Sequence, residues 1–333
     1  MIAFLQLLGG LVLLIYAGDA LVRGAVSMAQ RLDVPPMIVG LTVIAFGTSA
    51  PELMVGIDAV LTGVPTLALG NVVGSNIANI WLVIGLPALI APMVCPASKF
   101  SKNMLALIIA TLVFMVMAFN GDFTALNGVF LLTGLFAFLF FSSRTARRGK
   151  NHTSYQEILE DLEGVPKKAD SLKTASLIVL GGLIGLSIGA HFFVLGAVDF
   201  ARMLGVSEAI IGLTLVALGT SIPELVTAIA AAMRRHSDVA IGTVIGSNIF
   251  NLLGIIGVSS LLGNIPVPGG FLKFDLWIML GATLSFLPFA IMRKNVTRVT
   301  GAVFFLAYIF YIVFLASGVS AIDYPSTLTG LMG

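Results

Sequence analysis

The sequence is poor in the residue types on which disulfide scaffolds and most enzyme active sites depend. It has one cysteine and three histidines, and only 10% of its 333 residues are charged. The single cysteine, Cys95, excludes an intramolecular disulfide and by itself indicates no metal or redox site. The chain is instead apolar: 58% of its residues are hydrophobic, and its mean hydropathy is +1.06. A soluble domain of this size does not need so much apolar surface, so the composition predicts an integral membrane protein.

The apolar runs predict an all-α polytopic protein with ten transmembrane helices, each long enough to span a bilayer. No basic segment precedes the first run and no cleavage site follows it, so we expect a retained helix there rather than a signal peptide. The predicted helices are 2–22, 35–61, 66–91, 104–120, 123–142, 174–198, 207–232, 238–262, 273–291 and 300–318.

The strongest signal is an internal repeat with an offset of 172 residues. GLTVIAFGTSAPEL at 40–53 returns as GLTLVALGTSIPEL at 212–225, and GNVVGSNIAN at 70–79 returns as GTVIGSNIFN at 242–251. Without a gap, 35 of 79 aligned positions are identical. The chain therefore consists of two related halves, each of which carries a glutamate and asparagines inside an apolar stretch.

The distribution of positive charge predicts the orientation in the membrane. Sixteen of the 18 lysines and arginines fall in connections on one face of the predicted bundle, and only Arg202 and Lys273 fall on the other. The positive-inside rule then places the first face in the cytoplasm and both termini outside. The compact chain, with little mass outside the membrane, suggests a plasma (inner) membrane. Because each half, 1–143 and 174–333, contains five helices, the halves enter from opposite sides and form an inverted-topology repeat. The polar segment 144–173 is predicted to be a solvated cytoplasmic linker.

One short motif concentrates oxygen ligands at a break in the second predicted helix. Pro51 lacks an N–H, so the carbonyl of Gly47 loses its helical partner and the helix is expected to open there. Thr48 and Ser49 bring hydroxyls, and Glu52 follows directly with a carboxylate. Such hard oxygen ligands suit Na⁺ or Ca²⁺. The second half repeats the motif with Gly219, Thr220, Ser221, Pro223 and Glu224.

The next helix of each half brings a second group of polar side chains. Ser75 and Asn79 lie four residues apart and share a helix face. Asn79 can offer its amide oxygen to a cation without adding charge. Asn76 can either ligate an ion or hydrogen-bond a neighbouring helix, and both interpretations stay open, as they do for Asn248. The equivalents in the second half are Ser247, Asn248 and Asn251.

The two glutamates together suggest a mechanism. A carboxylate inside a bilayer costs several kcal/mol unless it is paired or binds a cation. Glu52 and Glu224 would give an empty site two uncompensated charges, and a carrier would pay that cost whenever it reoriented unloaded. A carrier that moves only when loaded exchanges ions, so the sequence predicts antiport without identifying the counter-ion.

These residues resemble the Na⁺/Ca²⁺ exchanger family of the cation/Ca²⁺ antiporter superfamily, whose two alpha repeats match 40–86 and 212–258. The resemblance implies that the second, third, seventh and eighth helices form the core, and that Glu52 and Glu224 are the shared Ca²⁺ and Na⁺ carboxylates. It implies Ca²⁺/Na⁺ exchange by alternating access. Further ligands implied by the resemblance are Thr48, Thr220, Ser75, Ser247, Asn79, Asn251 and the carbonyls of Ala45 and Ala217.

The chain departs from the family pattern at Asn251, where many Na⁺-coupled members carry an aspartate. The departure leaves H⁺ open as the coupling ion, but the glutamate typical of the proton-coupled branch is also missing, which favours Na⁺. A channel is the next alternative, and an intramembrane enzyme is disfavoured because no histidine or lysine base lies at a matching depth. We expect no cofactor, no nucleic acid and no obligate protein partner, only the ions and the lipid bilayer. Ser49, Ser221, Asn76, Asn248 and Asp58 are further candidate ligands, although Asp58 fits a wet interfacial acid better.

Overall fold

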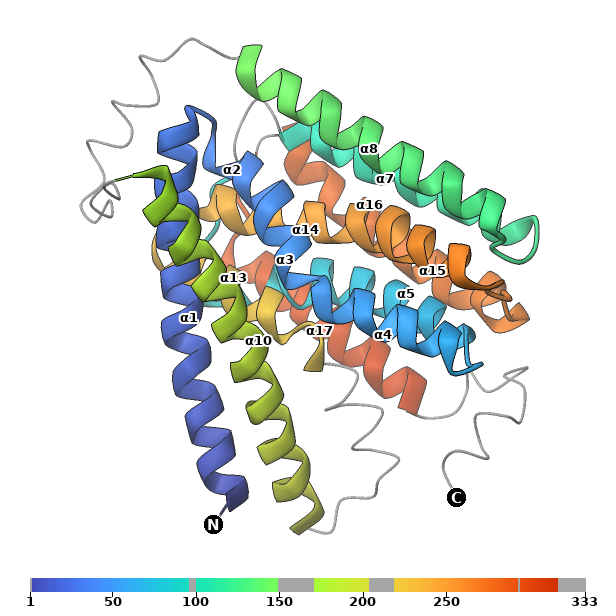
Figure 1. The fold of residues 1–333 in the computed structure, drawn as a ribbon, viewed down its shortest axis with the longest axis horizontal. Helices are drawn as coiled ribbons and strands as arrows, with labels where there is room; N and C mark the ends of the chain where they lie inside the picture. The colour runs from blue at the N-terminus through green and yellow to red at the C-terminus, as the bar shows by residue number, and fades with distance from the viewer. Residues whose placement is uncertain (1, 96–99, 149–170, 204–218, 293, 317–333) are drawn as a thin grey trace.

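The computed structural model describes residues 2–95, 100–148, 171–203, 219–292 and 294–316, which form a bundle of helices (Figure 1). The first half contains α1 (Ile2–Leu32), α2 (Pro36–Val39), the π-helical turn η1 (Gly40–Ile44), α3 (Ala45–Thr48), α4 (Ala50–Leu61), α5 (Thr66–Trp81), α6 (Gly85–Ile90), α7 (Phe100–Phe119) and α8 (Ala125–Arg148). The second contains α10 (Leu172–Met203), α13 (Ile222–Met233), α14 (Ser237–Ile249), η3 (Phe250–Ile255), α15 (Ile256–Leu262), η4 (Phe271–Asp275), α16 (Leu276–Met292) and α17 (Arg298–Ala316).

The prediction of an all-helical, multi-pass membrane protein is confirmed. Within the described ranges, eight helical segments are long and apolar enough to cross a bilayer, and the bent pair Pro36–Thr48 and Ala50–Leu61 makes a ninth. The predicted helix 207–232 lies partly outside the described residues; its described part begins at residue 219 and leads into α13.

The first helix was predicted too short. We expected it to end at residue 22, but α1 continues to Leu32, so Arg23 and Arg31 lie within a helix and not in a loop. The extension is stabilised by packing: Ala25, Val26 and their neighbours to Ala29 are buried. The predicted helix ended before Arg23, whereas the buried face of α1 continues past this charged residue.

The two halves are inverted relative to each other. Helices α1 and α10 are equivalents at the offset of 172, and they lie side by side in Figure 1. Gly10 lies against the backbone of Phe193, while Leu21 lies against Gly182. Residue numbers therefore rise in opposite directions along the pair. The offset turns one contact into the other, so a pseudo-two-fold axis runs between the helices, as an inverted repeat requires.

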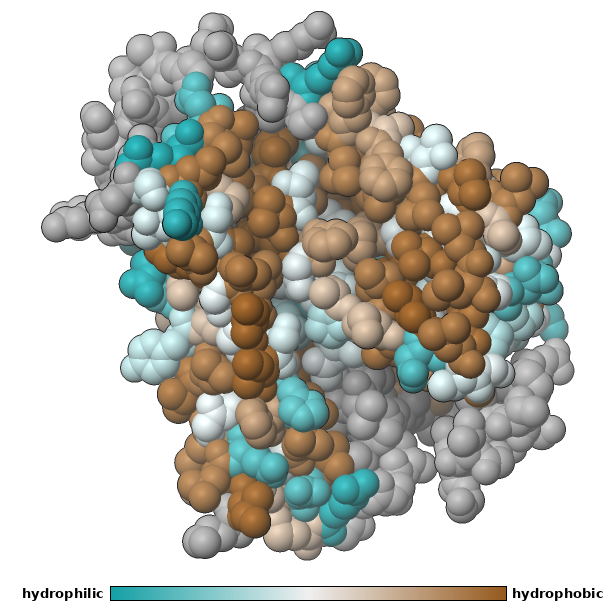
Figure 2. All heavy atoms as spheres, in the orientation of Figure 1, coloured by the Kyte–Doolittle hydropathy of each residue, from teal (hydrophilic) through white to brown (hydrophobic). Residues whose placement is uncertain are grey.

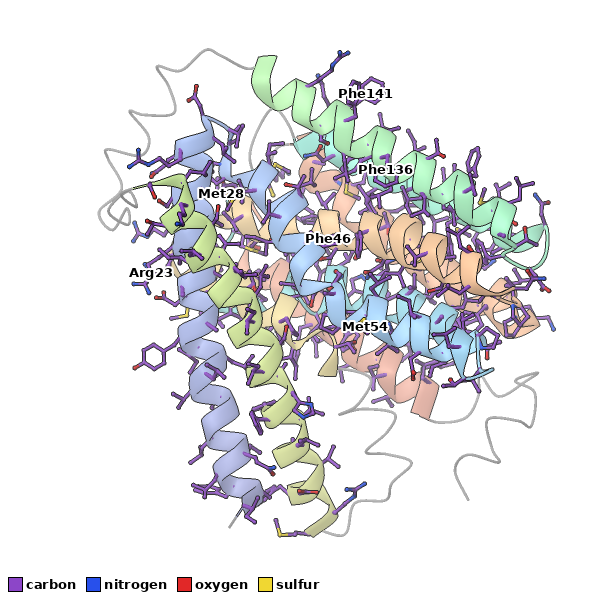
Figure 3. The ribbon with its side chains drawn as sticks, in the orientation of Figure 1. Arg23, Met28, Phe46, Met54, Phe136 and Phe141 are labelled. Carbon is purple, nitrogen blue, oxygen red and sulfur yellow. The ribbon has the colours of Figure 1, made fainter. Side chains whose placement is uncertain are left out.

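The interior of the bundle is formed by the segments that carry the polar motifs. Every residue in the most apolar window of Ser237–Leu262 is buried, compared with 22% in that of α8. Outside this centre the surface is apolar: Figure 2 shows hydrophobic side chains over much of the visible face, with hydrophilic ones toward its margins. Phe136 and Phe141 stand out from α8 in Figure 3, as lipid-facing residues do. The sites of interest are thus held on buried helices inside an apolar shell.

Candidate ion-binding site

The proline motifs break their helices where the sequence predicts. The segments on either side of Ser49 meet at 42°. The backbone is not α-helical at Ser49 (φ −85°, ψ 8°) or at its equivalent Ser221 (φ −86°, ψ 0°). The helices α4 and α13 each begin one residue later. Pro51 and Pro223 occupy the first turns, where their missing N–H costs nothing. Both halves therefore place the start of a helix inside the bundle.

The two glutamates occupy the first turns of these half-helices. Glu52 and Glu224 are each only 1% exposed, and they lie close enough for their charges to interact. The N-terminus of a helix carries a partial positive charge, which favours a carboxylate there. The partial positive charges at the N-termini of α4 and α13 cannot cancel the two full negative charges of the carboxylates in an interior without water. The arrangement therefore favours a bound cation.

Hydroxyl groups from both halves surround the carboxylates. Ser49 donates a hydrogen bond of 3.0 Å to Oε1 of Glu224, which ties the break in one half to the acid of the other. Thr48 and Ser247 also lie beside Glu224, and Thr220 lies beside Glu52. The structure thus brings together Glu52, Glu224, Thr48, Thr220, Ser49 and Ser247, as the sequence predicts; their role as ligands stays a prediction.

Several oxygens at this centre have no hydrogen-bond donor among the described residues. A buried oxygen without a donor is costly unless it faces a cation or water. Two carboxylate oxygens, Oε2 of Glu52 and of Glu224, and the amide oxygens of Asn79 and Asn251 are in this state. The hydroxyls of Thr220 and Ser247 are equally unbonded, although both lie beside a glutamate. A hard cation bound here would give these oxygens the partner that they lack.

The asparagines link the two central helices. Nδ2 of Asn79 donates to Oδ1 of Asn248 at 2.9 Å, and Nδ2 of Asn248 donates to the carbonyl of Asn76 at 3.2 Å. For Asn248 this favours the interhelical hydrogen bond over ion ligation, because both ends of its amide are used. Nδ2 of Asn76 contacts the thioether of Met279 at 3.9 Å, a partner that no sequence motif marks.

The remaining candidates have mixed positions. The Ala45 carbonyl already accepts hydrogen bonds from Ser49 N and Thr48 Oγ1, and Ala217 lies outside the described residues. Ser75 is buried on α5. Asp58 is exposed near the end of α4, which agrees with an interfacial acid. Ser221 and Asn251 are buried, at 3% and 1% exposure.

The chemistry of the donor set points to a hard cation. Carboxylates, hydroxyls and amides supply only oxygen, which suits Na⁺ and Ca²⁺ and is poor for soft metals. In the described part of the chain, no three histidine, cysteine, aspartate or glutamate side chains gather as a transition-metal site would require. A site with two acids and neutral oxygens can hold one divalent or several monovalent ions.

Comparisons with known proteins agree with this chemistry. Residues 2–144 and 174–317 match the model of the sodium/calcium exchanger protein family. The sodium/calcium exchanger MaX1 of Methanosarcina acetivorans is 33% identical, over 94% of this chain and 98% of its own. The inner membrane protein YrbG of Escherichia coli is 33% identical, over 79% and 80%. A solved structure of the sodium-calcium exchanger NCX_Mj superposes with a TM-score of 0.80 at 32% identity, covering 94% of this chain and 98% of that one.

Proposed function

The chain belongs to the sodium/calcium exchanger family of cation antiporters, and we propose that it exchanges Ca²⁺ for Na⁺ at the site built around Glu52 and Glu224. The family consists of transporters and not of enzymes. The observation that carries the proposal is the pair of buried, interacting carboxylates with unpartnered oxygens around them. MaX1 and NCX_Mj, which are named as sodium/calcium exchangers, support the choice of ions.

Charge accounts for the exchange. One Ca²⁺ neutralises the two glutamates, and so do two Na⁺. An empty site would carry both charges through an occluded state in which water is excluded, and the cost would be several kcal/mol. The loaded carrier reorients, whereas the unloaded one is held back. Efflux of one ion therefore requires uptake of the other, and the inverted repeat supplies two equivalent half-sites for the two facing states.

Asn251 is the specific observation that favours a second candidate. Its amide cannot ionise, so this position adds no third negative charge to attract an additional Na⁺. A carrier with two glutamates can also be neutralised by two protons, which gives Ca²⁺/H⁺ exchange on the same scaffold. We favour Na⁺ because the neutral oxygens at the centre suit a bare metal ion, while a proton needs only the carboxylates.

The proposed location is the plasma (inner) membrane, with both termini outside. The positive-inside distribution supports the orientation, and the name of YrbG, an inner membrane protein, supports the membrane. The ions available to the site would then be those of the cytoplasm and the exterior.

The test is ⁴⁵Ca²⁺ uptake into liposomes that contain the purified protein and are loaded with Na⁺. Uptake should start on dilution into Na⁺-free medium at clamped pH, and it should vanish in Glu52→Gln and in Glu224→Gln. Asp122→Asn is the matched control, because Asp122 is an exposed acid in a loop. Uptake that does not depend on Na⁺ but follows an imposed pH gradient would identify H⁺ as the coupling ion instead of Na⁺. Uptake that neither glutamine variant reduces would contradict the proposed site.

A further inference from the structure

The asparagines at the centre form a hydrogen-bond network that is only half made. Asn76 and Asn248 are equivalents at the offset of 172, and so are Asn79 and Asn251. One pair of contacts is present: Asn79 donates to Oδ1 of Asn248, and Asn248 donates to the carbonyl of Asn76. All four side chains are at most 1% exposed, so water does not readily replace a missing partner.

The bond from Asn79 to Asn248 decides which end of the Asn79 amide faces the site. The acceptor oxygen and the donor NH₂ of an amide lie in one plane and point away from each other on either side of the Cβ–Cγ bond. Because Oδ1 of Asn248 takes the Nδ2 end, Oδ1 of Asn79 must point the other way, and this oxygen has no donor among the described residues. Asn248 therefore presents the oxygen of Asn79, rather than its NH₂ group, to a cation.

The symmetry-related bonds are not made. The counterpart of the Asn79–Asn248 bond would run from Nδ2 of Asn251 to Oδ1 of Asn76. Both of these atoms are unpartnered among the described residues, as is Oδ1 of Asn251. No hydrogen bond in the described part of the chain fixes which end of the Asn251 amide faces the site. Asn76 contacts the sulfur of Met279 instead, and the equivalent of Met279 is Leu107, which offers no acceptor.

We propose that Asn248 and Asn76 are positioning residues that act in turn: Asn248 orients Asn79 in the state seen here, and Asn76 orients Asn251 in the oppositely facing state. An inverted repeat reaches its second state when the two halves exchange conformations. In that change the Asn79–Asn248 bond would break and the Asn251–Asn76 bond would form. One amide oxygen, of Asn79 or of Asn251, would then point toward the ion in each state. The inference rests on the proposed cation site and adds two residues that touch no ion.

The first arm of the test compares Asn248→Leu with the matched variant Asn76→Leu. The apparent Michaelis constant for ⁴⁵Ca²⁺ is measured at both membrane faces, in vesicles of known orientation. Each variant should raise the constant at one face about five- to tenfold, the equivalent of one buried hydrogen bond, and the two variants should affect opposite faces. A merely structural role would change the unfolding temperature or the maximal rate and would raise both constants alike.

The second arm removes the need for orientation. Aspartate at position 79 presents oxygen on both sides, so Asn248→Leu should have no further effect on the Michaelis constant in an Asn79→Asp background. Additive losses in the double variant would overturn the proposal, as would an Asn248→Leu protein with wild-type constants at both faces. Wild-type protein without any ⁴⁵Ca²⁺ exchange would instead contradict the proposed function, so the two failures are distinguishable.

Discussion

Single residues determine where the acids of this site stand. Each glutamate follows one residue after a proline, and the proline places it in the first turn of a new helix. A glutamate one turn further on would lose the partial positive charge of the helix start and would leave the centre of the bundle. The positions of Glu52 and Glu224 were therefore predictable from the local sequence alone.

The thiol of the one cysteine should not react with thiol reagents in the folded protein. Cys95 is buried after the end of α6, and burial raises the pKa of its thiol to about 12, because the thiolate loses its hydration. Fewer than about one in ten thousand thiols is then ionised at pH 7.5. Maleimide should fail to label the native protein within an hour and should label it fully in denaturant, as mass spectrometry can show. Rapid native labelling at neutral pH would mean that this thiol is accessible.

Helices α1 and α10 pack with their backbones in close contact. A Cβ atom on Gly10 would lie 2.5 Å from the backbone nitrogen of Phe193, whereas a Cβ atom on Gly9 meets nothing within 4 Å in the described structure. The adjacent glycines thus form a matched pair on one helix, with one at the interface and the other outside it.

We expect Gly10→Ala to destabilise the protein and Gly9→Ala to leave it unchanged or slightly more stable. The first forces two backbones apart, which costs about 1–3 kcal/mol; the second only improves helix propensity. Unfolding temperatures in detergent measure the difference. Equal effects of the two substitutions would show that α1 does not pack on α10 through this face.

Helix pairing sets the limit of what the sequence predicts. Asp19 and Arg23, four residues apart on α1, form an ion pair at 3.1 Å, which their spacing alone indicates. Asp19 also binds Arg234 at the end of α13, which no local pattern indicates because the partner is 215 residues away. The sequence left hydrogen bonding open for Asn76 and Asn248, but their partners escaped prediction for the same reason. Motifs identify the polar residues of an element, but only the packing of elements identifies their partners.

At the scale of the whole molecule, the inverted repeat accounts for the uneven distribution of positive charge along the sequence. Equivalent loops lie on opposite faces, so the two halves cannot share a charge pattern, and the positive charges must be distributed unequally between equivalent loops. The structure describes the inversion through α1 and α10, while the side that faces the cytoplasm stays a prediction.

Labelling of single introduced cysteines tests that orientation, because the native Cys95 is not expected to react. Asn120 and Lys294 are both exposed in short connections, and the positive-inside rule places them outside and inside, respectively. In intact cells an impermeant maleimide should label Asn120→Cys and should label Lys294→Cys only after the membrane is permeabilised. The reverse pattern would invert the assigned orientation without changing the fold.

The central claim is that two acids from opposite halves form one cation site. The most direct measurement is calorimetric titration of the purified protein with Ca²⁺ in Na⁺-free buffer, on the wild type and on Glu52→Gln and Glu224→Gln. A shared site predicts one Ca²⁺ per chain and the loss of measurable binding in each single variant, because either substitution removes half of the compensating charge. Two Ca²⁺ per chain, or a single variant that retains half of the binding at wild-type affinity, would show two independent sites and contradict the account.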